Sequence, residues 1–533
     1  MTFSSIAIKT PMPGKKNSGI LLSMLLALGA VLASFLWQGH MGLSTGDEGF
    51  LWYGAQRVLL GEVPIRDFDT LYDPGRFYWV AMVMSFLRDN GIISLRIANA
   101  IFQFLGLFIG LIMLSRSESR RDFLFLLVAA TTLLAWMFPW FKQCDIFITI
   151  LLIGVLSLFI HRPTGHRYFL MGFSLGVVAM FGRNHAVYGV VGSITAMAYV
   201  ARNRESDLGI IRGFFIWLTG IAVGYLPLLI MLVLIPGFAS AFWEGILALF
   251  LELKGTNNPL PVPWPWLVQF GHVSLGAGLR GVLTGFFFIA TIAFGIGALI
   301  LTIRQSMRNR PIDSTFAACS FLALPYVHYI FSRADISHLA LGIFPFLIGL
   351  LILLSGSSLR RKWSFAALLF CSSVLVMLPN HPGWSNKQYV PCDVAGSMLK
   401  IYPGDAAYIG MIKRLVDDYA PRGRSFIAIP VFPSAYAIFK RKSPTLEIYP
   451  TWPRNKKYQQ AEILRIKKAN PGFVVLCDLP LDGRDALRFS NTHSEIYKYI
   501  QETFEPLLGY TQDPTYQIFK STHPQDSITN TID

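Results

Sequence analysis

Long apolar runs constrain this chain more than any other feature of its sequence. Residues 19–37 contain no charged residue, and roughly 20 apolar helical residues are enough to cross the hydrocarbon core of a bilayer. A cleaved signal peptide has a shorter apolar core and a small-residue cleavage site, so we interpret this run as a retained first helix. Only 14% of the 533 residues are charged, against about a quarter in an ordinary soluble domain. The sequence therefore predicts a polytopic α-helical membrane protein.

The same reasoning predicts about eleven membrane-spanning helices. We expect them at residues 19–37, 95–114, 123–138, 146–160, 168–182, 186–200, 214–235, 281–302, 315–331, 339–355 and 363–379. Several of these runs are short for a full crossing. Their helices are expected to extend into flanking polar residues or to meet a locally thinned bilayer.

The charges between the spans predict an orientation. With a cytoplasmic N-terminus, one side of the membrane holds short basic segments, and such segments stay in the cytoplasm. Their basic residues are Lys9, Lys15, Lys16, Arg116, Arg120, Arg121, Arg162, Arg167, Arg202, Arg204, Arg212, Arg304, Arg308, Arg310, Arg360, Arg361 and Lys362. The acidic residues of the opposite side are Asp47, Glu48, Glu62, Asp67, Asp69, Asp73, Asp145, Glu244, Glu252 and Asp335. We therefore expect a multi-pass protein of the plasma (bacterial inner) membrane whose C-terminus is extracytoplasmic.

Two long loops and a C-terminal domain are expected on the outer side. The first loop, residues 40–92, should contain an amphipathic helix at 47–60 and an interfacial helix at 76–87. The second loop, 236–280, carries a segment too rich in proline to be helical. Residues 1–380 would form the transmembrane module and residues 381–533 an α/β domain. The domain has expected helices at 406–419 and 457–469 and expected buried strands at 425–430 and 472–477.

The first outer loop begins with two adjacent carboxylates, Asp47 and Glu48. Placed at a membrane surface, such a pair can provide a general base for an acceptor hydroxyl. The same residues are also suited to the start of the helix that follows, because aspartate caps helices and acids favour the first turn. From this motif alone, the capping interpretation is favoured.

Three further expected outer loops carry polar side chains at the same membrane level. Their residues are Lys142 and Asp145, then Arg183 and His185, then Arg333, Asp335 and His338. Each group also has a structural explanation, because cations at span ends commonly extend to the interface and Arg333 can pair with Asp335. If the loops converge, Lys142, Arg183 or Arg333 would hold a phosphate while Asp47 activates a hydroxyl.

The first outer loop resembles that of the GT-C glycosyltransferase superfamily, which includes the protein O-mannosyltransferases and the lipid A aminoarabinose transferases. The resemblance is carried by Gly46, Asp47, Glu48, Gly49, Tyr53, Ala55, Gly61, Pro64, Asp67, Pro74, Gly75 and Tyr78. It implies a polyprenyl-phosphate-sugar donor, transfer at the outer membrane face, and Asp47 as base with Glu48 as its companion. It also implies that Asp145, in the next outer loop, helps to shape the site. We expect His185, Asp335, His338, Asp67 and Tyr53 to shape the site as well.

The expected activity is inverting transfer of a sugar from a polyprenyl phosphate to an acceptor hydroxyl on a glycan, lipid or protein. A lipid-diphosphate-dependent glycan ligase or polymerase is the chemically nearest alternative, and a transporter or flippase is another. A transporter usually carries polar residues at mid-membrane and internal repeats, and neither is evident here. The net charge of +15 lies in short loop clusters, so no nucleic-acid partner is expected. No cofactor is indicated, and dependence on a divalent metal stays open.

Overall fold

The computed structural model describes residues 16–70, 72–117, 122–203, 208–250, 257–384 and 388–522. Outside these ranges lie Lys9, Lys15, Arg120, Arg121 and Arg204 of the basic set and Glu252 of the acidic set. The chain divides into two compact units. Unit 1 comprises Met1–Gly39, Arg96–Ile230 and Asn257–Ser385, and unit 2 comprises His40–Leu95, Met231–Thr256 and Asn386–Asp533.

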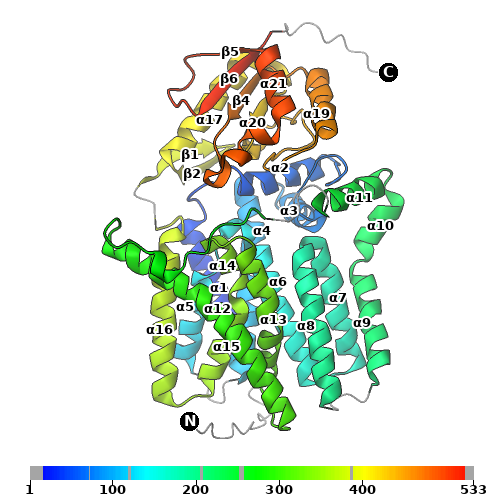
Figure 1. Cartoon of the computed structure of the whole chain (residues 1–533), viewed down its shortest axis with the longest axis vertical. Helices are drawn as coiled ribbons and strands as arrows, with labels where there is room; N and C mark the ends of the chain where they lie inside the picture. Colours follow the sequence, from blue (N-terminus) through cyan, green and yellow to red (C-terminus); the bar gives the residue numbers. More distant parts are fainter. Residues whose placement is uncertain are drawn as a thin grey trace. The chain divides into compact units, whose positions relative to one another are not determined.

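Unit 1 is built from helices, and every one of the eleven expected spans coincides with helical structure. The helices are α1 (Lys16–Gln38), α4 (Ile92–Ser117), α5 (Phe123–Ala135), α6 (Gln143–His161), α7 (Gly165–Phe181), α8 (Arg183–Arg202), α9 (Ile210–Gly224), α10 (Leu226–Leu234), α12 (Leu275–Met307), α13 (Ser314–Ser332), α14 (Ile336–Gly342), α15 (Phe344–Ser355) and α16 (Leu359–Met377). Helices α6, α7, α8 and α13 run lengthwise beside one another (Figure 1). The α4 and α10 helices each continue into unit 2.

Fewer helices satisfy a strict criterion of length and composition for a membrane span than the eleven expected from the sequence. Among the described residues, six helices are long and apolar enough to cross a membrane, or up to eight if each bent pair is one span. The expected spans at 214–235 and 339–355 are not straight helices. They are the pairs α9–α10 and α14–α15, bent by 54° and 52°. Pro227 and Pro345 are the second residues of α10 and α15, and proline cannot donate the hydrogen bond that a continuous helix needs there.

Helices α7 and α9 pack through glycines. A Cβ atom added to Gly172 of α7 would lie 1.9 Å from the carbonyl oxygen of Trp217 on α9, and one added to Gly224 would lie 2.1 Å from that of Phe173. Small residues at such positions let two membrane helices approach until their backbones touch. This pair is therefore held by close van der Waals packing.

Unit 2 contains a four-stranded sheet with helices around it. Its strands are ordered β3 (Ile427–Ile429), β4 (Phe473–Cys477), β6 (Tyr516–Ser521) and β5 (Phe504–Pro506), with β3 and β4 parallel and the other pairs antiparallel. The expected strands at 425–430 and 472–477 are thus confirmed as neighbours, and they bury Ile427, Val474 and Leu476 in the core. A separate hairpin joins β1 (Val390–Val394) and β2 (Ser397–Ile401).

The helices of unit 2 come from both ends of the sequence. They are α2 (Asp47–Leu59), α3 (Pro74–Leu87), α11 (Phe238–Ala248), α17 (Pro403–Tyr419), α18 (Pro433–Phe439), α19 (Lys456–Ala469), α20 (Phe489–Thr492) and α21 (Ser494–Thr503). The two helices expected in the first outer loop and the two expected in the C-terminal domain are all present. In the proline-rich part of the second loop, only Pro265–Leu267 forms a single 3-10 turn.

The first outer loop and the C-terminal residues pack together within unit 2. Lys400 donates its backbone N–H to His40 and accepts one from Gly42, at 2.9 and 2.8 Å. The backbone N–H of Ser434, on α18, donates to the carbonyl of Thr45 at 3.2 Å. Helix α2 lies against α18 so closely that a Cβ on Gly49 would meet Ser434 at 2.6 Å. The first outer loop, which contains Asp47, is therefore part of the same compact unit as the sheet.

Candidate active-site residues in the two units

Asp145 and His185 form a buried pair in unit 1. Asp145 lies in the first turn of α6 and His185 in the first turn of α8, with 3% and 2% of their surface exposed. The His185 Nε2 atom lies 2.8 Å from Asp145 Oδ1, and its Nδ1 atom lies 2.9 Å from the Tyr326 hydroxyl on α13. A ring protonated on Nε2 satisfies both contacts, donating to the carboxylate and accepting from the hydroxyl. Side chains from α6, α8 and α13 thus form one buried series of hydrogen-bonded polar groups.

A second polar group lies between α13 and α14 of the same unit. The Arg333 Nε atom donates to Asp335 Oδ2 at 2.7 Å, and the His338 Nδ1 atom lies 2.9 Å from Asp335 Oδ1. Asp335 is also the N-cap of α14, because Oδ1 accepts the backbone N–H of His338 at 2.8 Å. Burial works to raise the pKa of Asp335, but hydrogen bonds and charge from His338 and Arg333 outweigh it and hold the pKa below its usual range.

Tyr329 connects the two groups of unit 1. Its ring centroid lies 5.3 Å from that of His185 and 5.6 Å from that of His338. The three expected outer loops that contain Asp145, His185 and His338 therefore do converge. Because buried ionisable groups are costly, such a cluster inside a helical membrane unit is a default candidate for function.

The cations Lys142 and Arg183 lie at the N-terminal ends of α6 and α8, the two helices that carry Asp145 and His185. Lys142 ends a 3-10 turn directly before α6, and Arg183 is the first residue of α8; both are half-buried. The N-terminal end of a helix carries partial positive charge and unpaired N–H groups, which also favour an anion. These two side chains therefore add to the positive potential at the Asp145 end of unit 1.

Asp47 and Glu48 occupy the start of α2 in unit 2, but they behave differently. The N-cap residue is Gly46, with no side-chain cap hydrogen bond. Glu48 is fully buried and its Oε2 accepts the backbone N–H of Ser44 at 3.3 Å, which ties the chain entry to the helix. Asp47 is half-buried, and its Oδ1 accepts a hydrogen bond of 3.1 Å from the Tyr72 hydroxyl. The expectation that Asp47 caps this helix is thus wrong, because Gly46 is the N-cap and both acids lie in the first turn of α2.

Tyr53 and Asp67 stabilise unit 2 from within. The buried Tyr53 hydroxyl accepts the backbone N–H of Ser443 at 2.7 Å. Burial raises the pKa of this phenol. Asp67 binds the guanidinium of Arg66 through both oxygens, at 2.9 and 2.8 Å, and accepts the backbone N–H of Val63. Hydrogen bonding from Arg66 is the main reason that the pKa of Asp67 is lowered. The observed contacts of Tyr53 and Asp67 stabilise the folded conformation of the first outer loop.

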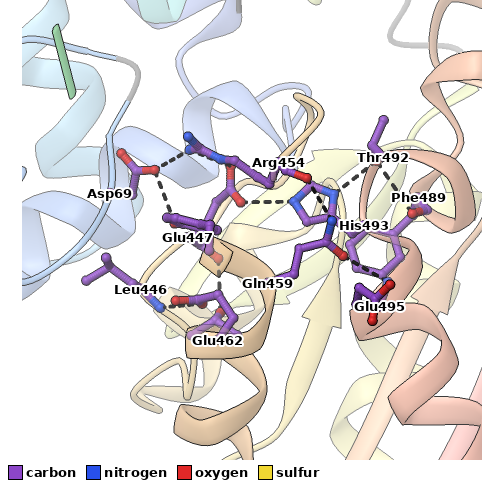
Figure 2. A network of polar contacts seen from close by, with 12 residues as sticks. Asp69, Leu446, Glu447, Arg454, Gln459, Glu462, Phe489, Thr492, His493 and Glu495 are labelled. Carbon is purple, nitrogen blue, oxygen red and sulfur yellow. Dashed lines mark hydrogen bonds and ion pairs between the residues drawn. The ribbon is translucent and has the colours of Figure 1, made fainter. Parts of the chain in front are cut away.

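A network that the sequence did not reveal joins the outer loop to the C-terminal residues of unit 2 (Figure 2). Arg454, only 7% of whose side chain is exposed, pairs with Asp69 of the loop and with Glu447. The His493 Nε2 atom lies 3.0 Å from Glu447 Oε2. Asp69 also donates its backbone N–H to the carbonyl of Leu446 at 2.9 Å. Sequence alone offers no signal for pairs separated by nearly four hundred residues.

The charges of this network explain two opposite pKa shifts. Burial works to raise the pKa of Glu447, but the charge of Arg454 and the hydrogen bond from His493 hold it below its usual value. Nearby Glu462 is paired with Arg465, but burial and the neighbouring charge of Glu447 raise the pKa of Glu462 to about 7. Its Oε2 accepts the backbone N–H of Leu446 at 2.8 Å. Glu447 is therefore held in its charged form, whereas Glu462 exchanges a proton near neutral pH.

No metal site is evident in the part of the chain that the structure describes, where no group of three or more His, Cys, Asp or Glu side chains could hold an ion. Asp67 and Asp69 are separated by one residue, but they do not share a site, because Asp67 pairs with Arg66 and Asp69 pairs with Arg454.

The fold places this chain in the class of membrane-embedded, mostly helical proteins with a sheet-containing C-terminal region. No protein-family profile matches the chain, and no curated protein matches its sequence.

Solved structures do resemble it. ArnT from Cupriavidus metallidurans bound to undecaprenyl phosphate is 12% identical, with a TM-score of 0.48 over 93% of this chain and 97% of that one. An Archaeoglobus fulgidus oligosaccharyltransferase tethered with an acceptor peptide is 11% identical, with a TM-score of 0.46 over 86% and 68%. The archaeal oligosaccharyltransferase AglB from the same organism, in complex with an inhibitory peptide and a dolichol-phosphate, is 12% identical, with a TM-score of 0.35 over 95% and 75%. These neighbours are GT-C glycosyltransferases, the superfamily that the first outer loop resembles. These TM-scores are below 0.5, so the proposal below rests on the residues of this chain.

Proposed function

We propose that this protein is a membrane glycosyltransferase that moves a sugar from a polyprenyl-phosphate donor to an acceptor hydroxyl at the outer membrane face. The observation that carries the proposal is the state of Asp47. It follows the N-cap of α2 without capping the helix, it is half-buried, and its carboxylate is oriented by Tyr72. A positioned and accessible carboxylate is what a general base requires.

The residues of unit 1 support the part of the proposal that concerns binding of the donor phosphate. Its cluster of Asp145, His185 and His338 is accompanied by the cations Lys142 and Arg183 at helix starts. We assign phosphate binding to Lys142, Arg183 and Arg333, because arginine and lysine stabilise charge on a departing phosphate. Asp145, His185, Asp335 and His338 would keep these cations and the donor in place.

The proposed step is a direct displacement. The bond between the anomeric carbon and the phosphate oxygen breaks, the acceptor oxygen bonds to that carbon, and the acceptor proton passes to Asp47. The polyprenyl phosphate leaves with the bonding electron pair. Attack from the face opposite the phosphate inverts the anomeric centre through an oxocarbenium-like transition state. A phosphate whose charge is neutralised needs no general acid to leave.

The experiment is sugar transfer from radiolabelled polyprenyl-phosphate sugars in membranes, comparing wild type with Asp47→Asn at equal expression. We expect transfer to fall by at least about a hundred-fold, the usual contribution of a general base, with donor binding retained. Asp405→Asn is the matched control, because Asp405 is also an aspartate in the first turn of a unit 2 helix. Full activity of Asp47→Asn would remove Asp47 from the mechanism. Transfer only from lipid-diphosphate sugars would favour the ligase alternative.

A further inference from the structure

A half-open pocket of about 230 Å³ lies in unit 1 between α4, α6 and α13. Its wall is almost entirely apolar, with Ile109, Met113 and Leu158 among its residues. For comparison, an enclosed apolar cavity of about 150 Å³ is large enough for benzene. The pocket therefore offers room for a segment of hydrocarbon chain.

The pocket lies at the end of unit 1 that is opposite to the Asp145 cluster. Arg116 is in the last turn of α4, Ser157 is near the end of α6, and Thr315 is in the first turn of α13. Asp145 lies in the first turn of α6, and the α6 residues that line the pocket, from Leu151 to Leu158, follow it at about 9 to 20 Å along the helix. The pocket is thus distinct from the proposed site of transfer.

One arginine lines this pocket, and two more lie close to it. Arg116 is one of its lining residues. Arg167 donates to the carbonyl of Leu158, also a lining residue, and to that of Arg162 at 3.2 Å. The like charges of Arg162 and Arg116 both act on Arg167. Within the described ranges, none of the three forms an ion pair with a carboxylate, so an anion at the mouth would relieve their mutual repulsion.

The pocket also has a small polar edge and a glycine in its wall. The Ser157 hydroxyl lies 2.8 Å from that of Thr315, and either oxygen can accept or donate a further hydrogen bond. Gly154 lines the pocket, and a Cβ added there would approach Ile109 Cγ2 to 3.1 Å. The lack of a side chain at Gly154 is therefore part of what creates the space.

We propose that this pocket binds an anionic glycerophospholipid, with one acyl chain against the apolar wall and the headgroup phosphate at Arg116 and Arg167. Membrane-spanning helices form the wall, so the surrounding bilayer supplies the occupant. These arginines, which form no ion pair with a carboxylate among the described residues, select an anionic headgroup over a zwitterionic one. Because basic segments mark the cytoplasmic side, the lipid would come from the cytoplasmic leaflet, where anionic lipids attract juxtamembrane arginines.

The test is lipid retention by the purified full-length protein, measured by native mass spectrometry after exchange into vesicles of phosphatidylglycerol and phosphatidylcholine. We expect one phosphatidylglycerol to remain bound in preference to phosphatidylcholine. Arg116→Gln should weaken this retention about five-fold, the effect of one cation near an anionic headgroup. Arg202→Gln is the control, because Arg202 is an exposed arginine in the last turn of α8 and does not line the pocket.

A second variant separates the apolar contribution from the charge. Gly154→Leu fills the wall without removing a cation, and it should lower retention of either lipid; circular dichroism and size-exclusion chromatography establish that it folds. Equal retention of both lipids by wild type, or unchanged retention in Arg116→Gln, would overturn the proposal. One-for-one displacement of the bound lipid by polyprenyl phosphate would also overturn it, because the pocket would then belong to the donor.

Discussion

At the scale of single residues, the proposed reaction depends on how Asp47 is held. Its one described hydrogen bond comes from Tyr72, whose ring also packs against Phe50 at 5.4 Å and under the guanidinium of Arg76 at 4.8 Å. The ring contacts fix the position of the phenol, and the hydroxyl then fixes the direction of the carboxylate. A base must be aimed at the proton that it removes, so orientation is as important as basicity.

Replacing Tyr72 with Phe should therefore reduce transfer while leaving the fold intact. The ring contacts remain and one hydrogen bond of about 1 kcal/mol is lost, so we expect kcat to fall about five-fold with little change in thermal stability. Steady-state kinetics in detergent or nanodiscs measure this. Tyr510→Phe removes a similar tyrosine–aspartate bond, that to Asp418 in another part of unit 2, and should leave kcat unchanged. An equal loss in both variants would contradict a specific role for Tyr72.

At the scale of helices, the contact between α7 and α9 depends on glycine. The facing positions are Gly172, Gly176, Gly220 and Gly224, where an added Cβ would lie 1.9 to 2.4 Å from backbone atoms of the opposite helix. Backbone atoms cannot move aside as a flexible side chain can. Any larger residue therefore forces the two helices apart along the contact.

Gly172→Leu is expected to destabilise unit 1 by about 3 kcal/mol or more, because overpacking against backbone has no inexpensive relaxation. Thermal unfolding of the detergent-solubilised protein, followed by fluorescence-detected size exclusion, provides the measurement. Gly297→Leu is the matched control on α12, where Gly297 is exposed and nothing lies within 4 Å of an added Cβ. Similar unfolding temperatures for the two variants would show that the α7–α9 contact is not as tight as described.

At the scale of the whole molecule, the first outer loop and the C-terminal residues form one unit through Arg454. This side chain is paired with Asp69 of the loop and with Glu447, next to the sheet (Figure 2). Removing one partner of a buried ion pair leaves the other charge without compensation, which costs more than the pair itself contributes. The C-terminal region thus supports the loop that carries Asp47, whatever it does for the acceptor.

Arg454→Gln should lower both the stability of unit 2 and sugar transfer. The buried Glu447 and the half-buried Asp69 lose their cation, for which about 3 kcal/mol is the expected scale. We expect faster limited proteolysis within residues 40–95 in the variant, because the loop is less firmly held, and the transfer assay measures the loss of activity. Lys456→Gln breaks only a 3.6 Å surface pair with Glu495 and should change stability by less than about 1 kcal/mol. Unchanged protease resistance in Arg454→Gln would mean that the backbone contacts alone hold the loop.

Local patterns were sufficient for much of this architecture. Apolar runs located every helical segment of unit 1, and alternation and turn residues located α2, α3, β3 and β4, because helix and strand periodicity are properties of neighbouring residues. The polar residues of three outer loops could also be selected, since charge near a membrane is costly wherever it occurs. Their convergence was a hypothesis, and Asp145, His185 and His338 confirm it within unit 1.

Other features arise only when distant segments pack. Tyr326 bonds His185 across 141 positions of sequence, and Arg454 pairs with Asp69 across 385. No periodicity encodes such pairs, because a side chain's partner is determined by which surfaces meet once the backbone is folded. Helix positions and the chemical nature of the site thus follow from local sequence, whereas the hydrogen-bond partner of each buried charge follows from tertiary packing.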